Sequence, residues 1–297
     1  MKEMALFPAK WWKKCENDCV QCLLCPRKCR IPEGASGFCA VRKNVHGALF
    51  SQSYGYLAAL QIDPIEKKPL RHFLPGTRTF SIGTLGCNLK CLYCQNHHLS
   101  RNHYDPRKKN TYYSPDAITD LILRHGCESI SYTYNEPGVF GEYVMDCAVT
   151  AAQKGLKNIL VSNGYITKEA AKEIYPLLDA ANFDVKGFSE EYYSWMCSGK
   201  LQTVKESVEL FRNTCGKHAE LTYLVVPGKN DMREMIDAYL NWVENALGIE
   251  TPIHFTAYHP DYLYSESCRT PRTLLDELQD YAHSSRKFPN VYLGNIC

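Results

Sequence analysis

Short apolar runs alternate with amphipathic stretches from residue 79 to the end of the chain. We expect strands at 79–84, 128–134, 157–162, 181–186, 219–226 and 252–258, with 290–294 as a further candidate. We expect helices at about 114–125, 139–154, 167–178, 203–215, 231–247 and 271–285. Strands and helices that repeat at this spacing are typical of parallel β/α units. Six or seven units are fewer than the eight of a complete barrel. The pattern therefore predicts an α/β fold, a partial (β/α)6 TIM-like barrel over residues 76–297.

Residues 1–75 show a different pattern, which predicts a small Cys-rich, metal-binding-like subdomain. Prolines and glycines interrupt any long helix between residues 26 and 37, so we expect a knuckle-like loop region there. Residues 45–75 are expected to form a small β-containing connection into the main domain. The segment is too loop-rich to bury much core, and a bound metal would replace that core.

Four of the six cysteines between residues 15 and 39 form one plausible ligand set: Cys22, Cys25, Cys29 and Cys39. Zinc, a second iron–sulfur cluster and unmetallated thiols all remain open. Because nothing in the segment supplies an open coordination position, we expect a closed structural site.

A second cysteine group follows the first expected strand of the main domain. Cys87, Cys91 and Cys94 stand in C-x3-C-x2-C spacing just after Gly86. Thiolates in such a loop suit zinc or an iron–sulfur cluster. Three cysteines would leave one iron of a four-iron cubane free to bind a substrate or cofactor. The alternative is a structural Cys3His zinc site completed by His97 or His98.

Composition narrows the class of protein. The chain has 297 residues, 45% hydrophobic content and a net charge of +2, which gives no argument for a nucleic-acid or membrane partner. No stretch reaches the roughly 18 apolar residues of a membrane span, and the N-terminus lacks the apolar core of a signal peptide. We therefore expect a cytoplasmic protein. Because the cytoplasm is reducing, most of its fifteen cysteines are expected to be metal ligands and not disulfide partners. Five scattered ones are expected to be small buried hydrophobes: Cys127, Cys147, Cys197, Cys215 and Cys268.

Polar residues repeatedly follow the expected strands, where β/α barrels carry their chemistry. These endings are Asn135-Glu136-Pro137, Ser162-Asn163-Gly164, Asp184-Val-Lys186, Pro227-Gly-Lys-Asn-Asp231 and Tyr258-His259-Pro260. Each alone has an ordinary explanation as a turn, a solvated ion pair or a structural histidine. Together with the cysteine loop they predict one functional rim, which a zinc knuckle would not need.

Several motifs point to a known family. GCNLKCLYC resembles the cluster loop of radical S-adenosylmethionine (SAM) enzymes, and YTYNEP occupies the place of their Gly-Gly-Glu-Pro-like motif. DVK, LVVPGKND and AYH resemble the activating enzymes of glycyl-radical proteins such as pyruvate formate-lyase. CLLCPRKC, GFCAVR, DPIEKKPLRHFLPG and FTAYHPDY are more similar to the AmmeMemoRadiSam system radical SAM enzymes, over nearly the whole chain. One departure is His97-His98, where that family carries Trp-Glu.

The resemblance implies a [4Fe–4S] cluster on Cys87, Cys91 and Cys94, whose open iron chelates SAM. An electron would break the C5′–S bond, and the resulting 5′-deoxyadenosyl radical would take hydrogen from an unidentified substrate. Glu136 would accept a hydrogen bond from the methionyl ammonium. The other implied cofactor contacts are Tyr93 near the adenine, Asn135, Ser162, Asn163, Asp184, Lys186 and His259. Lys186 and His259 would act closest to the chemistry, although Asp184 and Lys186 could instead form a rim salt bridge.

The resemblance also implies partners. These are an electron donor such as flavodoxin or ferredoxin, together with AMMECR1-like and Memo-like proteins. Two other functions stay open from the sequence. One is a glycyl-radical activase acting on a large partner protein, and the other is a non-enzymatic zinc or iron–sulfur protein.

Overall fold

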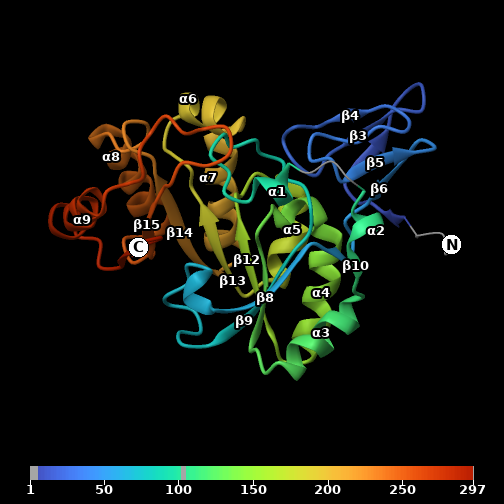
Figure 1. Cartoon of the computed structure of the whole chain (residues 1–297), viewed down its shortest axis with the longest axis horizontal. Coiled ribbons are helices and arrows are strands. Elements are labelled where there is room, and N and C mark those ends of the chain that lie inside the picture. The colour runs from blue at the N-terminus through green and yellow to red at the C-terminus, as the bar shows by residue number, and fades with distance from the viewer. Residues whose placement is uncertain (1–5, 102–104, 297) are drawn as a thin grey trace.

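A mostly parallel sheet forms the centre of the computed structural model, which describes residues 6–101 and 105–296 (Figure 1). Within these residues the sheet consists of β8 (Ala59–Pro64), β9 (Arg78–Gly83), β11 (Ser129–Tyr132), β12 (Lys157–Ser162), β13 (Ala180–Asp184), β14 (His218–Val225), β15 (Ile253–Ala257) and β16 (Val291–Gly294). Their spatial order is β16–β15–β14–β13–β12–β11–β9–β8. Neighbours from β9 to β16 run parallel, which confirms the expected α/β fold.

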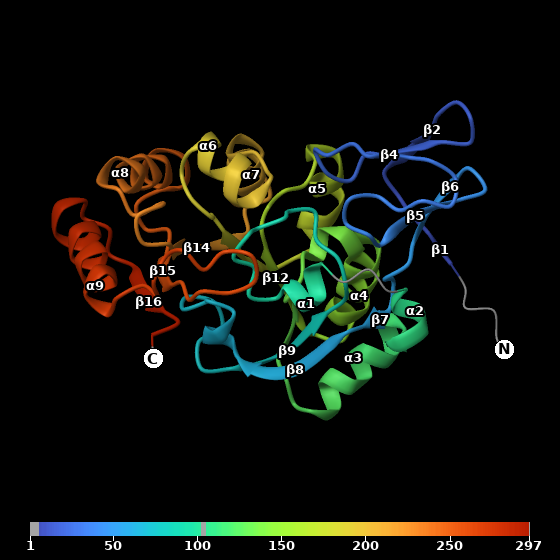
Figure 2. The same cartoon turned by 45° about the horizontal axis from the view of Figure 1, so that its top comes forward.

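Helices connect the parallel strands and cover the outer face of the sheet (Figure 2). They are α3 (Pro115–Arg124), α4 (Gly141–Gln153), α5 (Lys168–Ile174), α7 (Leu201–Glu209), α8 (Arg233–Trp242) and α9 (Arg272–Asp280). The last three continue into the π-helical turns η5 (Leu210–Thr214), η6 (Val243–Leu247) and η7 (Tyr281–Ser285). Ser114 and Thr167 cap the first turns of α3 and α5 by accepting backbone N–H bonds. The expected helices are therefore present, with small shifts at their ends.

Shorter elements shape the loops between strands and helices. They are η1 (Ile65–Lys67), α1 (His97–Ser100), α2 (Pro106–Lys109), β10 (Thr111–Tyr112), η2 (Pro137–Phe140), η3 (Tyr175–Leu177), α6 (Glu190–Tyr192) and η4 (Tyr193–Cys197). β10 pairs with β7 (Tyr56–Leu57). Every residue of β11 and β15 is buried, as expected for parallel strands covered on both faces.

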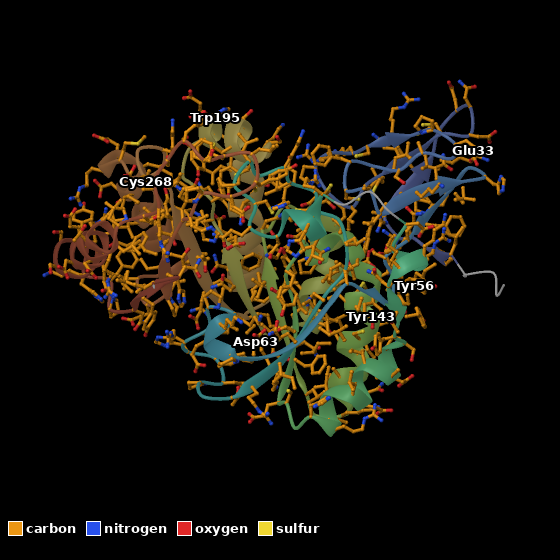
Figure 3. The ribbon with its side chains drawn as sticks, viewed as in Figure 1. Glu33, Tyr56, Asp63, Tyr143, Trp195 and Cys268 are labelled. Carbon is orange, nitrogen blue, oxygen red and sulfur yellow. The ribbon has the colours of Figure 1, made fainter. Side chains whose placement is uncertain are left out.

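The main sheet begins earlier than the predicted boundary at residue 76. β8 pairs antiparallel with β9 over six residues, so the stretch predicted as a connection supplies the edge strand of the barrel. Asp63 near the end of β8 lies at the lower end of the sheet, far from Trp195 at the upper rim (Figure 3). There was little indication of this strand in the sequence because Asp63-Pro64 is typical of a turn.

The chain after β8 packs against the lower end of the parallel strands. The side-chain amide of Asn182 donates to the carbonyl of Pro69 at 2.8 Å. The backbone N–H of His72 donates to the buried carboxylate of Glu220 at 2.8 Å. Leu70 is fully buried there. This segment, residues 65–74, is called the floor loop below. It leaves the opposite, C-terminal end of the strands for the functional rim.

The Cys-rich segment contains more regular structure than the expected knuckle-like loops. Its strands are β1 (Phe7–Pro8), β2 (Trp12–Lys14), β3 (Val20–Cys22), β4 (Arg30–Ile31), β5 (Arg42–Val45) and β6 (Ala48–Ser51). Within the described residues they form the sheets β2–β3–β4 and β1–β6–β5, at the end of the molecule opposite α8 and α9 (Figure 2).

The apolar side chains of this segment join the core of the main domain instead of forming a separate one. Val20, Ile31 and Val41 belong to the same continuous cluster of buried residues as the sheet. A buried ion pair adds to this contact, because Nη1 of Arg42 donates to the carboxylate of Glu142 on α4 at 2.8 and 3.0 Å. The segment therefore depends on the main domain for much of its packing.

Candidate active site

The loop after β9 carries Cys87, Cys91 and Cys94 and is held by backbone hydrogen bonds. The N–H groups of Lys90 and Leu92 donate, each at 2.9 Å, to carbonyls at the end of η4. These bonds fix the middle of the loop against a rigid neighbour. They aim the three cysteines at the C-terminal end of the sheet, the end where the sequence placed the functional rim.

Gly86 lets the chain turn sharply just before Cys87. Its φ is +90°, and a Cβ atom at this position would lie 2.4 Å from the carbonyl oxygen of Cys39. Only glycine fits a backbone that is both left-handed and this close to another chain segment. The loop and the Cys-rich segment are therefore in direct contact.

The three thiols of the loop are partly exposed and line one cavity of about 290 Å³. Burial raises the pKa of the Cys87 and Cys94 thiols, so bare thiolates are disfavoured at neutral pH. A bound iron cation reverses this preference, because metal coordination deprotonates a thiol. The donor set is therefore suited to hold a cation.

Glu136, the acidic residue of the YTYNEP motif, is almost completely buried beside the thiols. Its Oε1 accepts from the backbone N–H of Gly138 and from the hydroxyl of Ser162, both at 2.8 Å. Its Oε2 accepts from the backbone N–H of Asn163 at 2.9 Å. Burial raises the pKa of Glu136, although the three donors oppose this shift. The carboxylate also lines the cavity, where an ammonium group is a suitable further partner.

Two asparagines connect this carboxylate region to the cysteine loop. Asn135 accepts from the N–H of Thr84 at 3.0 Å and donates to the carbonyl of Gly86 at 2.8 Å. The side-chain amide of Asn163 donates to Oδ1 of Asn88 at 3.1 Å and lies 3.7 Å from the sulfur of Cys87. Both amides also line the cavity. Asn135 follows β11 and Asn163 follows β12, so these contacts hold the cysteine loop against the ends of two neighbouring strands.

Asp184 and Lys186 form an ion pair at the end of β13. Nζ of Lys186 lies 2.7 Å from Oδ2 of Asp184, with the two side chains 17% and 34% exposed. Burial alone would lower the pKa of Lys186, but the Asp184 carboxylate and the neighbouring Cys91 and Cys197 together outweigh it, and the pKa is raised. Both residues line the cavity. The pair thus faces the site and keeps Lys186 charged.

Of the two remaining predicted residues, Tyr93 lies at the cavity and His259 does not. Tyr93 lines the cavity, is 2% exposed, and its hydroxyl lies 3.5 Å from the sulfur of Cys197. His259 is exposed and is not part of the cavity wall. The neighbouring Tyr258 takes the buried position after β15, where its hydroxyl donates to the carbonyl of Tyr264 at 2.9 Å. The structure therefore does not bring His259 to the site.

The residues of the cavity fit a [4Fe–4S] cluster with SAM. Three cysteine sulfurs are present, and the buried carboxylate of Glu136 is complementary to an ammonium. The Lys186 ammonium is complementary to a carboxylate. The donor set thus matches the charges of the amino-acid part of SAM.

A sequence model of the Radical SAM superfamily matches residues 81–242, which include all three cysteines and this acidic residue. The chain belongs to the radical SAM superfamily. Membership implies an enzyme with a [4Fe–4S] cluster and SAM, so the non-enzymatic alternative from the sequence is set aside. The uncharacterized protein MJ0808 of Methanocaldococcus jannaschii is 39% identical over 291 residues, covering 97% of this chain and 85% of that protein.

Several solved structures share the fold. Streptococcus suis SuiB bound to S-adenosylmethionine has a TM-score of 0.55 at 14% identity, covering 72% of this chain and 49% of SuiB. A radical SAM methyltransferase from Sphaerobacter thermophilus has a TM-score of 0.56 at 11% identity, covering 75% and 68%. Escherichia coli QueE has a TM-score of 0.50 at 12% identity, covering 80% and 93%. In the part of the chain described here, no helix has both the length and the apolar character needed to cross a bilayer.

The cavity of this radical SAM protein also contains residues that the sequence reasoning missed. Lys67 and Pro69 of the floor loop line it, as do Thr222, Thr256 and Asn295. Thr222 lies directly beside Asp184 in the register of β13 and β14. The polar residues Glu220 and Thr222 alternate with apolar ones along β14, and this alternation is the signal that could have identified the inward-facing threonine. The motif DPIEKKPLRHFLPG covers the floor loop, but no site residue was predicted in it because its residues precede β9.

Cys197 is a further missed neighbour of the radical SAM loop. It was predicted to be a small buried hydrophobe, and it is indeed fully buried. Its thiol also contacts Cys91, which raises the pKa of the Cys91 thiol even more than burial does. A single cysteine far along the sequence gives no signal of such a contact.

The departure at His97-His98 lies at the edge of the site. The ring of His97 stacks on Tyr262 with the ring centroids 4.8 Å apart, and its Nδ1 lies 3.6 Å from Oδ1 of Asp261. His97 thus links the radical SAM loop to the segment after β15. A separate groove of about 350 Å³ between α5 and α7 contains none of the predicted site residues.

The four cysteines of the N-terminal set line a cavity of their own: Cys22, Cys25, Cys29 and Cys39. Burial raises the pKa of the Cys39 thiol to about 11, so this thiol also favours a bound cation for ionisation. Among residues 6–101 and 105–296, no three or more His, Cys, Asp or Glu side chains converge as a single metal ion requires. This holds for both cysteine sets.

Proposed function

We propose that this protein is a radical SAM enzyme that cleaves SAM reductively and removes a hydrogen atom from an unidentified substrate. The observation that supports this function is one cavity lined by three cysteine thiols, a buried carboxylate and a charged lysine. When bound, the cluster supplies one electron to the sulfonium of SAM, which gives methionine and a 5′-deoxyadenosyl radical that takes the hydrogen atom.

The side chains of this chain would bind and orient the cofactor. Glu136 accepts a hydrogen bond from the methionyl ammonium through the free capacity of its carboxylate. Lys186, held by Asp184, interacts with the carboxylate or ribose oxygens of SAM. Asn135 and Asn163 keep the cysteine loop in place, and the buried walls exclude water from the reacting atoms. Tyr93 packs beside the adenine at the edge of the cavity.

The test is anaerobic turnover of the reconstituted full-length protein with SAM and dithionite. Formation of 5′-deoxyadenosine is expected, and replacing Cys87, Cys91 and Cys94 together by Ala should abolish it. Cys268→Ala, which removes an exposed cysteine outside the site, is the control and should retain the activity. Stoichiometric zinc with no iron uptake in the wild type would overturn the proposal.

We further infer that the enzyme is of the AmmeMemoRadiSam type. The DPIEKKPLRHFLPG motif that carries this resemblance forms the end of β8 and the floor loop, and two of its residues line the cavity. Motif and site are therefore physically connected. The inference extends to a flavodoxin- or ferredoxin-type electron donor and to AMMECR1-like and Memo-like partners.

The partners are tested with purified proteins. A reduced flavodoxin or ferredoxin should replace dithionite in the turnover assay. The AMMECR1-like and Memo-like proteins should co-elute with this chain in size-exclusion chromatography. Separate elution of both at micromolar concentrations would contradict the partner assignment while leaving the SAM chemistry intact.

A further inference from the structure

The N-terminal cysteine cavity is lined by buried thiols, apolar side chains and a buried cation. The four cysteines line this cavity together with the apolar side chains of Leu24, Ile31 and Val139. The cation of Arg42 lines it as well. Three of the cysteines, Cys22, Cys25 and Cys39, are no more than 9% exposed. A dry, apolar pocket with several thiols and a cation is suited to an anionic metal–thiolate centre.

Arg42 is 1% exposed and has one unused hydrogen-bond donor in this cavity. Its Nη1 donates to Glu142, and its Nη2 donates to the carbonyl of Lys10. Its Nε has no hydrogen-bond partner among the described residues. An unsatisfied buried donor costs about 1–3 kcal/mol. An N–H bond to a thiolate or sulfide sulfur would satisfy this donor.

The position of the four cysteines favours a cluster over zinc. They lie next to the loop that carries Cys87, Cys91 and Cys94, so a redox-active centre there could exchange electrons with the active site, whereas zinc has no redox chemistry. Four cysteine thiolates are also the complete ligand set of a [4Fe–4S] cluster.

The cavity lies directly behind the radical SAM loop. The carbonyl of Cys39 packs against Gly86, one residue before Cys87. The guanidinium of Arg27 lines the cavity and donates to the backbone carbonyl of Asn88, one residue after Cys87. Two short contacts therefore connect the two cysteine sets.

We propose that Cys22, Cys25, Cys29 and Cys39 bind a second iron–sulfur cluster, with the Nε–H of Arg42 donating to one of its sulfurs. This selects the second cluster among the three alternatives that the sequence left open, and it gives a redox role to the site that was expected to be structural. With four cysteine ligands the cluster has no open iron, so it does not bind SAM. Its position makes it a second one-electron centre next to the active site. That use rests on the proposed function, whereas the presence of the cluster does not.

Iron counting in anaerobically reconstituted full-length protein tests the proposal. The wild type is expected to hold about eight iron atoms, as two [4Fe–4S] clusters require. The double variant Cys25→Ala/Cys29→Ala should hold about four, as should the triple variant Cys87→Ala/Cys91→Ala/Cys94→Ala. Mössbauer spectra should change on addition of SAM in the wild type and the double variant, and stay unchanged in the triple variant.

The triple variant leaves the N-terminal set intact, so the test survives if the double variant fails to fold. Cys15→Ala, which removes a cysteine of the same segment outside the set, should keep about eight irons. One zinc and no iron in the triple variant would overturn the second cluster, as would four irons in the wild type that the triple variant loses entirely. Four SAM-insensitive irons that only the double variant loses would support the second cluster and refute the proposed function.

Discussion

The backbone N–H of Asn163 donates a 2.9 Å hydrogen bond to Oε2 of Glu136, joining the ends of two neighbouring strands. Through this bond the acidic residue fixes the turn that carries Asn163, and the side chain of Asn163 in turn lies against Cys87. The proposed SAM contact of Glu136 and the position of the cysteine loop are therefore connected through one carboxylate.

Replacing Glu136 by Gln tests the proposed contact of this residue with SAM. The shape is kept, but the charged acceptor is lost, and charge-assisted hydrogen bonds are worth about 1.5–3 kcal/mol. SAM affinity should fall about tenfold or more, while the iron content stays at the wild-type level. Isothermal titration under anaerobic conditions measures the affinity. Glu128→Gln, an exposed residue just before the same strand, is the control. Unchanged affinity would show that Glu136 does not contact SAM.

The ion pair of Asp184 and Lys186 predicts non-additive effects on stability. Lys186→Met leaves a half-buried carboxylate without its partner, and we expect a loss of about 1–3 kcal/mol in the free energy of unfolding. Adding Asp184→Asn should recover part of this loss, because the unpaired charge is gone. Urea denaturation of the single and double variants measures both effects. Strictly additive losses would mean that the two side chains do not interact.

Gly86→Ala should destabilise the protein and disturb cluster binding together. The new Cβ would clash with the carbonyl of Cys39 and would strain the left-handed backbone, at about 2–4 kcal/mol. Gly155→Ala is the matched control, because Gly155 has φ of +78° but open space around it. Melting temperature and iron content should both fall much more in the first variant. Equal losses in the two variants would refute the steric argument.

Glu220 predicts a specific acid dependence of stability. It accepts hydrogen bonds from His254 at 2.7 Å and from His218 at 3.0 Å. Burial alone would raise its pKa, but these donors and the backbone N–H groups of the floor loop lower the pKa to about 2. Because the folded pKa lies below the unfolded one, the stabilisation is complete above about pH 5 and is lost as the pH falls toward 2.

The measurement is the free energy of unfolding of wild type and Glu220→Gln between pH 7 and pH 3. At neutral pH the wild type should be more stable by about 2–3 kcal/mol, and the difference should narrow steadily below pH 5. Glu234→Gln on the outer surface of α8 should show neither effect. If the difference in unfolding free energy between the two proteins did not change with pH, Glu220 would stabilise the protein through packing and not through its charge.

The parallel strands and their helices were predictable because their apolar periodicity directly reflects burial on both faces of the sheet. The cysteine loop, Glu136 and the Asp184–Lys186 pair were predictable as strand endings, since parallel strands bring their carboxyl ends to one rim. Their convergence on one cavity follows from that topology.

Other features could not be predicted from local patterns. β8 is an edge strand whose Asp-Pro ending resembles a turn, and its pairing is set by contacts far along the chain. His259 follows a strand like the other rim residues, but Tyr258 occupies the inward position there. The contact of Cys197 with Cys91 depends on a turn more than a hundred residues away, for which sequence spacing carries no information.

The contact of Arg27 with the carbonyl of Ser198 has a consequence for the order in which the protein is made. The docking surface for the N-terminal segment is incomplete until residue 198 has been synthesised. At the usual 5–20 residues per second, ribosomes need roughly 10–30 s to reach that point after Arg27. During this interval the cysteines of the segment are not yet enclosed by the rest of the domain, so the proposed N-terminal cluster can be inserted before the domain closes.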